Sequence, residues 1–181
     1  MLDILQFIFW SVTYVLIIIA GYLSDGEKKV SMPYSAGVLN FAWEICALYN
    51  SGGLWGHAVW LGLDIVIVFW GFRFLKTNKV RFIYAASIAV FTSILFYIFT
   101  LSNGMLISVF IIDLIMAVSF LVDRVKLSPK LKVPIAFTKL LGDMFAGLHY
   151  APYCAFVGIL AGIILICNLY YLYLCIKEKT R

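Results

Sequence analysis

The sequence predicts an all-α, polytopic membrane protein with seven transmembrane helices, its N-terminus outside and its C-terminus in the cytoplasm. The 181 residues are 64% hydrophobic and only 13% charged, and the mean hydropathy of +1.02 is too high for a water-soluble domain of this length. Apolar runs near the ~20 residues needed to cross a ~30 Å hydrocarbon core recur seven times. The basic residues, which leave a net charge of +5, fall in short clusters between these runs, a pattern typical of membrane topology rather than of nucleic-acid binding.

Each apolar run is expected to form one helix of a single domain over residues 1–181. The first run lacks a basic leader and a small-residue cleavage site, so it is expected to be a retained helix rather than a signal peptide. The second and sixth runs begin at Pro33 and Pro134, and proline suits the first turn of a helix. A parallel repeat of three helices, one linker helix and three helices would account for the proline at the start of both runs. The runs cover residues 4–23, 33–49, 54–72, 81–101, 105–122, 134–150 and 152–176.

The connections between the runs predict the orientation. Three of them, NSGGLWGH, SNG and HYAPY, contain no Lys or Arg. With seven helices, every basic cluster lies on the opposite face of the membrane, which the positive-inside rule assigns to the cytoplasm. The membrane itself is expected to be a bacterial inner membrane or that of the endoplasmic reticulum. The clusters are Lys28 and Lys29; Arg73, Lys76, Lys79 and Arg81; Arg124, Lys126, Lys130 and Lys132; and Lys177, Lys179 and Arg181.

Four carboxyl-bearing residues lie at the same depth of four predicted helices. Each sits about 12–17 Å along its helix at a rise of about 1.5 Å per residue. An ionised carboxylate facing lipid at that depth costs at least ~2.5 kcal/mol, so all four are expected to point into the bundle. They are Glu44, Asp64, Asp113 and Asp143.

Helical spacing predicts which side chains accompany these acids. Residues three or four positions apart share a helix face, so the acids are expected to face a polar centre with aromatic walls. The sets that share a face are Asn40, Trp43 and Glu44; His57, Trp60 and Asp64; and Lys139, Asp143, Gly147 and Tyr150.

Several of these residues also have purely structural interpretations. Lys139 and Asp143 are one turn apart and are expected to form a salt bridge. Asp113 either joins the polar centre or merely supports a helix contact. His57 and His149 lie at the outer helix ends, where a histidine is expected to be solvated. Aromatic anchors at the membrane interface are expected at Trp10, Trp70, Tyr170, Tyr171 and Tyr173. Packing roles are expected for Cys46, Cys154, Cys167 and Cys175.

Glu44 differs from the other acids because no basic residue lies within one helical turn of it. It therefore either finds a partner on another helix or is protonated, and burial favours the uncharged form of a carboxyl. A neutral glutamic acid in an apolar, aromatic pocket is suited to general-acid chemistry on a hydrophobic substrate. Asn40, one turn away, could orient it through a hydrogen bond.

The second predicted helix contains the pattern N-x-x-W-E, at Asn40, Trp43 and Glu44, within the stretch MPYSAGVLNFAWEICALY. HAVWLGLDIVIVFWGFRF and FTKLLGDMFAGLHY follow in the third and sixth helices. In these stretches and in its seven helices the chain resembles the integral-membrane terpene cyclases of meroterpenoid and indole-diterpene biosynthesis.

The resemblance implies an enzyme in which a buried acid protonates a prenyl chain, usually at a terminal epoxide, and the chain closes into rings through carbocations. Glu44 would be one of the required acids. The family's second acid lies in the last helix, at a position that falls on Asn168 here, so the sequence departs from the family pattern. Either Asp64 or Asp143 is left to supply the second carboxyl. Substrate-binding roles are expected for Asn40, Trp43, Trp60, Asp113, Tyr150 and Asn168.

Proton-initiated cyclisation requires neither a metal nor another cofactor. The sequence has no DDxxD or DxDD cluster and no paired-aspartate motif for magnesium diphosphate, which argues against a diphosphate-ionising enzyme. Aromatic faces would stabilise the carbocations by ~0.5–2 kcal/mol each. The expected partners are a prenylated small molecule entering from lipid and the membrane lipid itself, with no nucleic acid; the sequence does not predict an oligomeric state.

Two other classes fit parts of the pattern. A small proton-coupled or sugar-type carrier would also have acids at mid-membrane, with Asn40 and Asn168 as substrate ligands. The strongly apolar surroundings and the lack of paired mid-membrane prolines weigh against it. A retinal protein would need a Schiff-base lysine in the last helix, whereas Lys139 lies one helix earlier.

Overall fold

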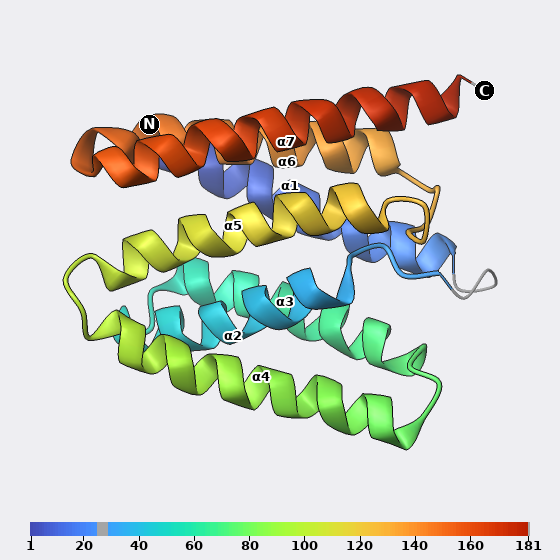
Figure 1. Cartoon of the computed structure of the whole chain (residues 1–181), viewed down its shortest axis with the longest axis horizontal. Helices are drawn as coiled ribbons and strands as arrows, with labels where there is room; N and C mark the ends of the chain where they lie inside the picture. Colours follow the sequence, from blue (N-terminus) through green and yellow to red (C-terminus); the bar gives the residue numbers. More distant parts are fainter. Residues whose placement is uncertain (25–28, 181) are drawn as a thin grey trace.

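The structure is a computed structural model that describes residues 1–24 and 29–180. Lys28 and Arg181, two members of the predicted basic clusters, lie outside the described residues. Within these ranges the chain forms a bundle of seven α-helices without strands (Figure 1), which confirms the predicted all-α class and helix number. The helices are α1 (Leu2–Leu23), α2 (Tyr34–Asn50), α3 (Trp55–Arg73), α4 (Asn78–Phe99), α5 (Gly104–Asp123), α6 (Lys132–Tyr150) and α7 (Ala155–Lys179).

Three of the helix starts that differ from the predicted ones have local reasons. α4 begins before residue 81 because the Thr77 hydroxyl caps it, accepting a hydrogen bond from the Val80 N–H at 3.2 Å. α6 begins at Lys132, which leaves Pro134 in the first turn, where its missing N–H costs nothing. α7 begins after Cys154, whose extended backbone follows a short 3₁₀ turn at Ala151–Tyr153.

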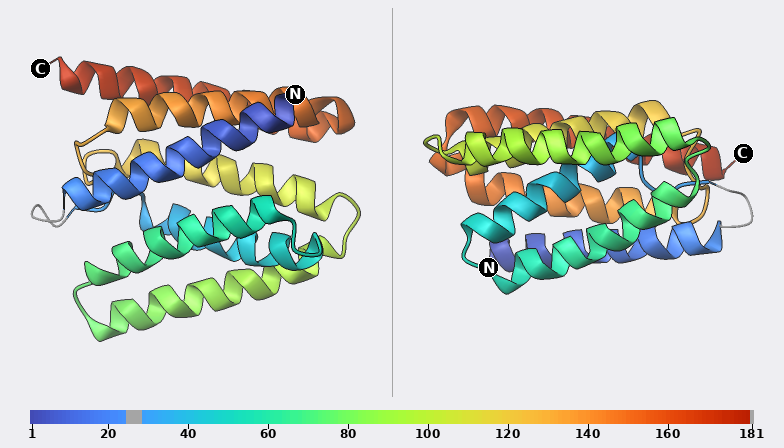
Figure 2. Two further views of the ribbon diagram at one scale, coloured as in Figure 1. Left: turned by 180° about the vertical axis from the view of Figure 1, so that it is seen from behind. Right: turned by 90° about the horizontal axis from the view of Figure 1, so that it is seen from below.

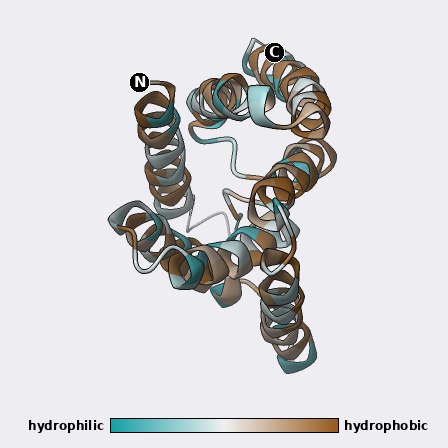
Figure 3. Cartoon of the chain, turned by 90° about the vertical axis from the view of Figure 1, so that its left-hand side faces the viewer, coloured by the Kyte–Doolittle hydropathy of each residue, from teal (hydrophilic) through white to brown (hydrophobic). Residues whose placement is uncertain are grey.

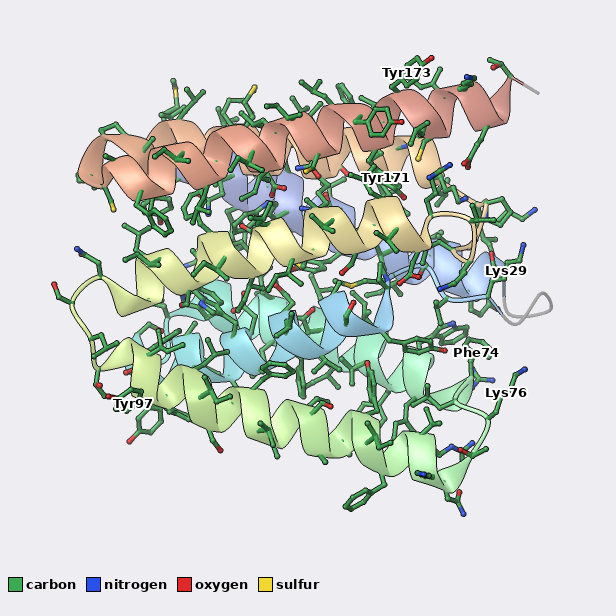
Figure 4. All side chains as sticks on the ribbon, in the orientation of Figure 1. Lys29, Phe74, Lys76, Tyr97, Tyr171 and Tyr173 are labelled. Carbon is green, nitrogen blue, oxygen red and sulfur yellow. The ribbon has the colours of Figure 1, made fainter. Side chains whose placement is uncertain are left out.

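The helices run antiparallel along the bundle, so alternate connections lie at the same end (Figure 1). Figure 4 labels Lys29 and Lys76 at the end where the α1–α2 and α3–α4 connections lie. The α5–α6 connection and the C-terminal end of α7 are at this end too. The described basic clusters are therefore gathered at one end of the bundle, as the sequence predicts.

Packing joins helices that are far apart in the sequence. α1 packs chiefly against α6, α6 against α7, and α7 against α5, while α2 contacts α3, α4 and α5. The two further views in Figure 2 show α1 alongside α6 and α4 beside α2. The three-plus-one-plus-three repeat would pack α1 with α2 and α3 as one unit. In the first unit α3 contacts both α1 and α2, and in the second α7 contacts both α5 and α6. The packing is therefore compatible with this division, and the repeat stays a prediction.

Five helices, α1, α3, α4, α5 and α7, are long and apolar enough to cross a membrane. α2 is only 17 residues long and carries Asn40 and Glu44, and α6 carries Lys132, Lys139 and Asp143. The acids and the amide on these two helices are buried, so neither helix needs a uniformly apolar sequence to present an apolar exterior. In the end view, α4 lies at the outside of the bundle (Figure 3), and only its Tyr84 and Leu95 are buried.

Candidate functional site

Asn40 is the centre of a hydrogen-bond network between α1, α2 and α3. Its Nδ2 donates to the Tyr14 hydroxyl at 2.6 Å and to Asp64 Oδ2 at 2.7 Å, which uses both of its N–H groups. Asp64 is completely buried, and its Oδ1 has no hydrogen-bond partner among the described residues. Asn40 and Asp64 therefore lie together inside the bundle, as predicted, but Asn40 orients Asp64 rather than Glu44.

Glu44 is paired with His57 across the α2–α3 contact. The Glu44 side chain is only 4% exposed, and its Oε2 lies 3.0 Å from His57 Nδ1. The turn between the helices uses Gly52 and Gly53, with φ of 66° and 88°, a conformation that favours glycine, and it brings the first turn of α3 back alongside α2. The prediction of a solvated His57 is wrong, because this packing leaves its side chain only 14% exposed.

Aromatic rings enclose the imidazole of His57. Trp43 and Trp60 both meet it edge to face, with ring centroids 5.6 and 5.8 Å away. Each indole also donates a hydrogen bond at 3.1 Å, Trp43 to the Ser108 hydroxyl and Trp60 to the Ser11 hydroxyl. Serines on two other helices thus fix the orientation of the rings beside the Glu44–His57 pair.

Asp143 is the centre of a third polar group, between α1, α6 and α7. Its Oδ2 accepts hydrogen bonds from Lys139 Nζ at 2.5 Å and from Asn168 Nδ2 at 2.6 Å. Its Oδ1 accepts one from Trp10 Nε1 at 2.7 Å. The predicted salt bridge is confirmed, and the carboxyl group accepts hydrogen bonds from three donors on three helices. The prediction of an interfacial anchor at Trp10 is wrong, because the close packing of α1 on α6 turns its indole inward.

Members of all three polar groups, together with Asp113, line the same small cavity. Its volume is about 30 Å³, enough for one or two water molecules. Asp113 is buried and makes no hydrogen bond to another side chain within the described part of the chain. The polar residues on the cavity wall are Thr13, Tyr14, Asn40, Glu44, Asp113, Lys139 and Asp143. All four predicted acids thus lie inside the bundle, with Asp64 joined to this cavity through Asn40.

A much larger cleft of about 640 Å³ adjoins the small cavity. Trp10, Trp43 and Val109 line both spaces, and His57 lies on the wall of the cleft. The cleft extends to the end of the bundle opposite the basic connections, where Asp3, Leu54 and Asn103 line it. Its aromatic residues are Phe7, Trp10, Trp43, Trp55, Trp60, Phe110 and Tyr150. Trp43, Trp60 and Tyr150, three of the residues predicted to bind substrate, therefore line the same cleft.

Sequence reasoning missed the contribution of α1. Gln6, Trp10 and Tyr14 recur at four-residue spacing and share a face, so they form a stripe of hydrogen-bonding side chains that helical periodicity could have identified. Tyr171, predicted as an interfacial anchor, is also buried, at 1% exposed, and packs against Phe120 on α5. In Figure 4 its side chain points toward α5, whereas that of Tyr173 points away from the bundle.

Among residues 1–24 and 29–180, no three His, Cys, Asp or Glu side chains gather closely enough to hold a metal ion. The polar groups around the cleft and the small cavity are carboxyl, imidazole, amide, indole, hydroxyl and ammonium groups. Comparisons with protein-family models, with curated proteins and with solved structures give no match to this chain.

Proposed function

We propose that the protein is a membrane-embedded, metal-independent terpene cyclase that protonates the terminal epoxide or alkene of a prenyl chain and guides its closure into rings. The observation that carries the proposal is the buried Glu44–His57 pair, because its imidazole lines an aromatic cleft of about 640 Å³. This volume falls within the range of about 300–1,000 Å³ typical of small-molecule sites.

The Glu44–His57 pair can hold one transferable proton. In the neutral pair this proton belongs either to the carboxyl or to the imidazole, and in both cases it lies between Oε2 and Nδ1. We expect Glu44 to give its proton by way of the His57 imidazole, which lines the cleft. Protonation of an epoxide oxygen there breaks a C–O bond, and the π electrons of neighbouring alkenes then form the new C–C bonds. Loss of a proton from the last cation restores the pair, so the reaction is an isomerisation that consumes no second substrate.

The walls of the cleft suit a cationic intermediate. The faces of Trp10, Trp43 and Trp60 could each stabilise a positive charge by ~0.5–2 kcal/mol. The carboxylate that Glu44 becomes after proton transfer would add an attractive charge in surroundings of low dielectric constant. A mostly apolar lining also limits the access of water, which would otherwise trap the cation as an alcohol.

The other carboxyls are suited to different tasks. Asp143, held by Lys139 and two further donors, supplies a fixed negative charge. Asp64 accepts a hydrogen bond from Asn40 and so fixes the position of this amide on the wall of the small cavity. Asp113 faces the small cavity without a hydrogen bond to another described side chain, so it has the most freedom to exchange a proton and is the best candidate for the second acid or base.

The proposal includes seven membrane crossings with the basic connections in the cytoplasm. α2 and α6 lie alongside the five more apolar helices (Figure 1), and their buried charges are paired or enclosed. The cleft then opens near the non-cytoplasmic membrane surface. A prenylated substrate could enter it from the lipid with its chain directed toward mid-membrane.

The proposal can be tested with membranes that contain the protein and an epoxidised prenyl-aromatic compound. An isomer of the compound, with the same mass but a different chromatographic retention time, is the expected product. Glu44→Gln should slow its formation by about 10²–10⁴-fold, because proton transfer is lost. Asp123→Asn is the matched control, since this carboxyl lies near the basic end and pairs with Lys126. Equal rates for Glu44→Gln and the unaltered protein would exclude Glu44 as the acid.

A proton-coupled carrier is the second candidate. The observation that favours it is the cavity beneath the cleft, where Glu44, Asp113, Lys139 and Asp143 gather, because buried ionisable groups often mark a path for protons. Uptake of a solute into proteoliposomes, together with no product from any of a panel of prenyl compounds, would favour the carrier over the cyclase.

A further inference from the structure

Gln6 lies on the wall of the outer part of the cleft and carries an amide oxygen without a hydrogen-bond partner among the described residues. The residue is 7% exposed and lines the cleft from α1. Its Oε1 is buried and has no hydrogen-bond partner among the described residues. Buried amide oxygens are normally paired, so an unpaired one on the wall of a cleft indicates a place where a ligand can supply the missing hydrogen bond.

The position of Gln6 relates the amide to the aromatic wall. Gln6 and Trp10 are four residues apart on the same face of α1, which puts Gln6 about 6 Å nearer the open end of the cleft. Phe7 and Trp10 pack against Trp60, with ring centroids 5.1 and 5.5 Å away, and Trp60 in turn meets His57. A continuous aromatic surface therefore leads from the neighbourhood of Gln6 to the Glu44–His57 pair.

The lining of the cleft changes in character along its length. Asp3, Gln6 and Asn103 provide polar groups toward the open end, whereas the inner part is formed by indole, phenyl and aliphatic groups together with the imidazole of His57. An amphiphile with a small polar head and an apolar tail matches this order. A hydroxyl head can both donate and accept, so it can pair with the Gln6 amide whichever way the amide is turned.

We propose that Gln6 binds the hydroxyl-bearing head of an isoprenoid whose tail lies along Phe7, Trp10 and Trp60. The inference rests on the proposed function in one respect, namely that the far end of the tail is protonated and cyclised. Gln6 is a specificity-determining residue in this arrangement, and it takes no part in proton transfer. The substrate class is thus a prenylated compound with a hydroxyl group at the end remote from the alkene or epoxide that reacts.

The experiment compares two probes that differ in the head, farnesol and the hydrocarbon farnesene, at equal mole fraction in nanodiscs containing the protein. Binding is followed by quenching of tryptophan fluorescence, because Trp10, Trp43, Trp55 and Trp60 line the cleft. We expect farnesol to bind roughly fivefold more tightly than farnesene to the unaltered protein, the effect of about one hydrogen bond. In Gln6→Leu the two probes should bind equally.

Ser93→Leu on α4 is the matched control, because it also replaces a polar side chain by leucine. The Ser93 hydroxyl donates to the Ala89 carbonyl of its own helix, so this variant should keep the fivefold preference for farnesol. Glu44→Gln should keep it as well, because the head does not reach the acid. Equal binding of both probes to the unaltered protein, a preference that survives in Gln6→Leu, or binding of neither probe would each overturn the assignment. Failure of the proposed cyclase activity is measured separately, as absence of the isomeric product while the fluorescence preference persists.

Discussion

The buried carboxyls of this protein differ mainly in the partner that each one has found. Glu44 pairs with an imidazole, Asp64 with the amide of Asn40, and Asp143 with the ammonium group of Lys139. An imidazole can exchange a proton near neutral pH, whereas an amide cannot and a lysine holds its proton strongly. Chemically similar residues at similar depth are therefore suited to different tasks, and the Glu44–His57 pair is the one best suited to deliver a proton.

Replacement of His57 tests the pair from its other side. His57→Phe keeps a ring against Trp43 and Trp60 but leaves the Glu44 carboxyl without a partner, so we expect a loss of stability of about 1–3 kcal/mol. Formation of the isomeric product should fall by roughly 10²-fold. Thermal unfolding in detergent and the product assay measure the two effects. His149→Phe, which alters the other histidine, should change neither by much; full activity in His57→Phe would contradict a role for His57 in proton delivery.

The Lys139–Asp143 pair gives a different kind of prediction. Asp143→Asn leaves the buried ammonium group of Lys139 without a counter-charge, and the expected loss is about 3–5 kcal/mol in the free energy of unfolding. The double variant Lys139→Met, Asp143→Asn should recover much of this loss, because it buries no unpaired charge. Denaturation curves of the single and double variants provide the measurement. If the single and the double variant were equally stable, the unpaired charge of Lys139 would not be the cause of the lost stability.

At the scale of elements, the contact between α1 and α6 brings Trp10 to Asp143. Gly142 makes this contact possible, because a Cβ built on it would lie 2.1 Å from Trp10 Cδ1 and 2.6 Å from its Nε1. The indole thus packs directly on the backbone of α6 and donates to the neighbouring carboxylate. Two helices that are far apart in the sequence are fixed to each other by one glycine, one indole and one carboxylate.

Gly142→Ala should therefore push α1 away from α6. We expect a loss of stability of about 1–3 kcal/mol from overpacking, together with a change in tryptophan fluorescence as Trp10 moves. Gly162→Ala on α7 is the control, because a Cβ added there would meet no atom of another described element within 4 Å, and alanine there should be neutral or slightly stabilising. A Gly142→Ala variant as stable as the unaltered protein would mean that the α1–α6 contact can shift at little cost.

At the scale of the whole molecule, uneven placement of charge gives the bundle two different ends. The described basic clusters lie at one end, and the cleft extends to the other. The proposed orientation, with the basic end in the cytoplasm, rests on the positive-inside rule. It would place the open part of the cleft near the opposite membrane surface, where an amphiphile rests with its head in the interface.

Cysteine labelling tests this orientation. In a background with the four native cysteines replaced by alanine, Ser102→Cys in the α4–α5 connection should react with a membrane-impermeant maleimide in intact cells. Lys130→Cys in the α5–α6 connection should react only in inverted vesicles. Both residues are exposed, so burial does not limit their labelling. The reverse pattern, or labelling of both from one side, would contradict seven crossings with a cytoplasmic C-terminus.

Composition and periodicity alone determined the all-α class, the seven helices, the common end of the basic connections and the inward position of Glu44, Asp64, Asp113 and Asp143. They could do so because, in a lipid environment, a long apolar run has few stable structures other than a helix. A charge within such a run has few stable positions other than the interior of the bundle. The partners of those acids were decided only by tertiary structure. His57 lies near the start of its helix and Trp10 lies within an apolar run, and nothing local identifies either side chain as the partner of an acid. The α2–α3 turn and the α1–α6 contact bring them to Glu44 and Asp143. A hydrogen bond between helices depends on their relative rotation and separation, and these are set by how whole helix surfaces fit together.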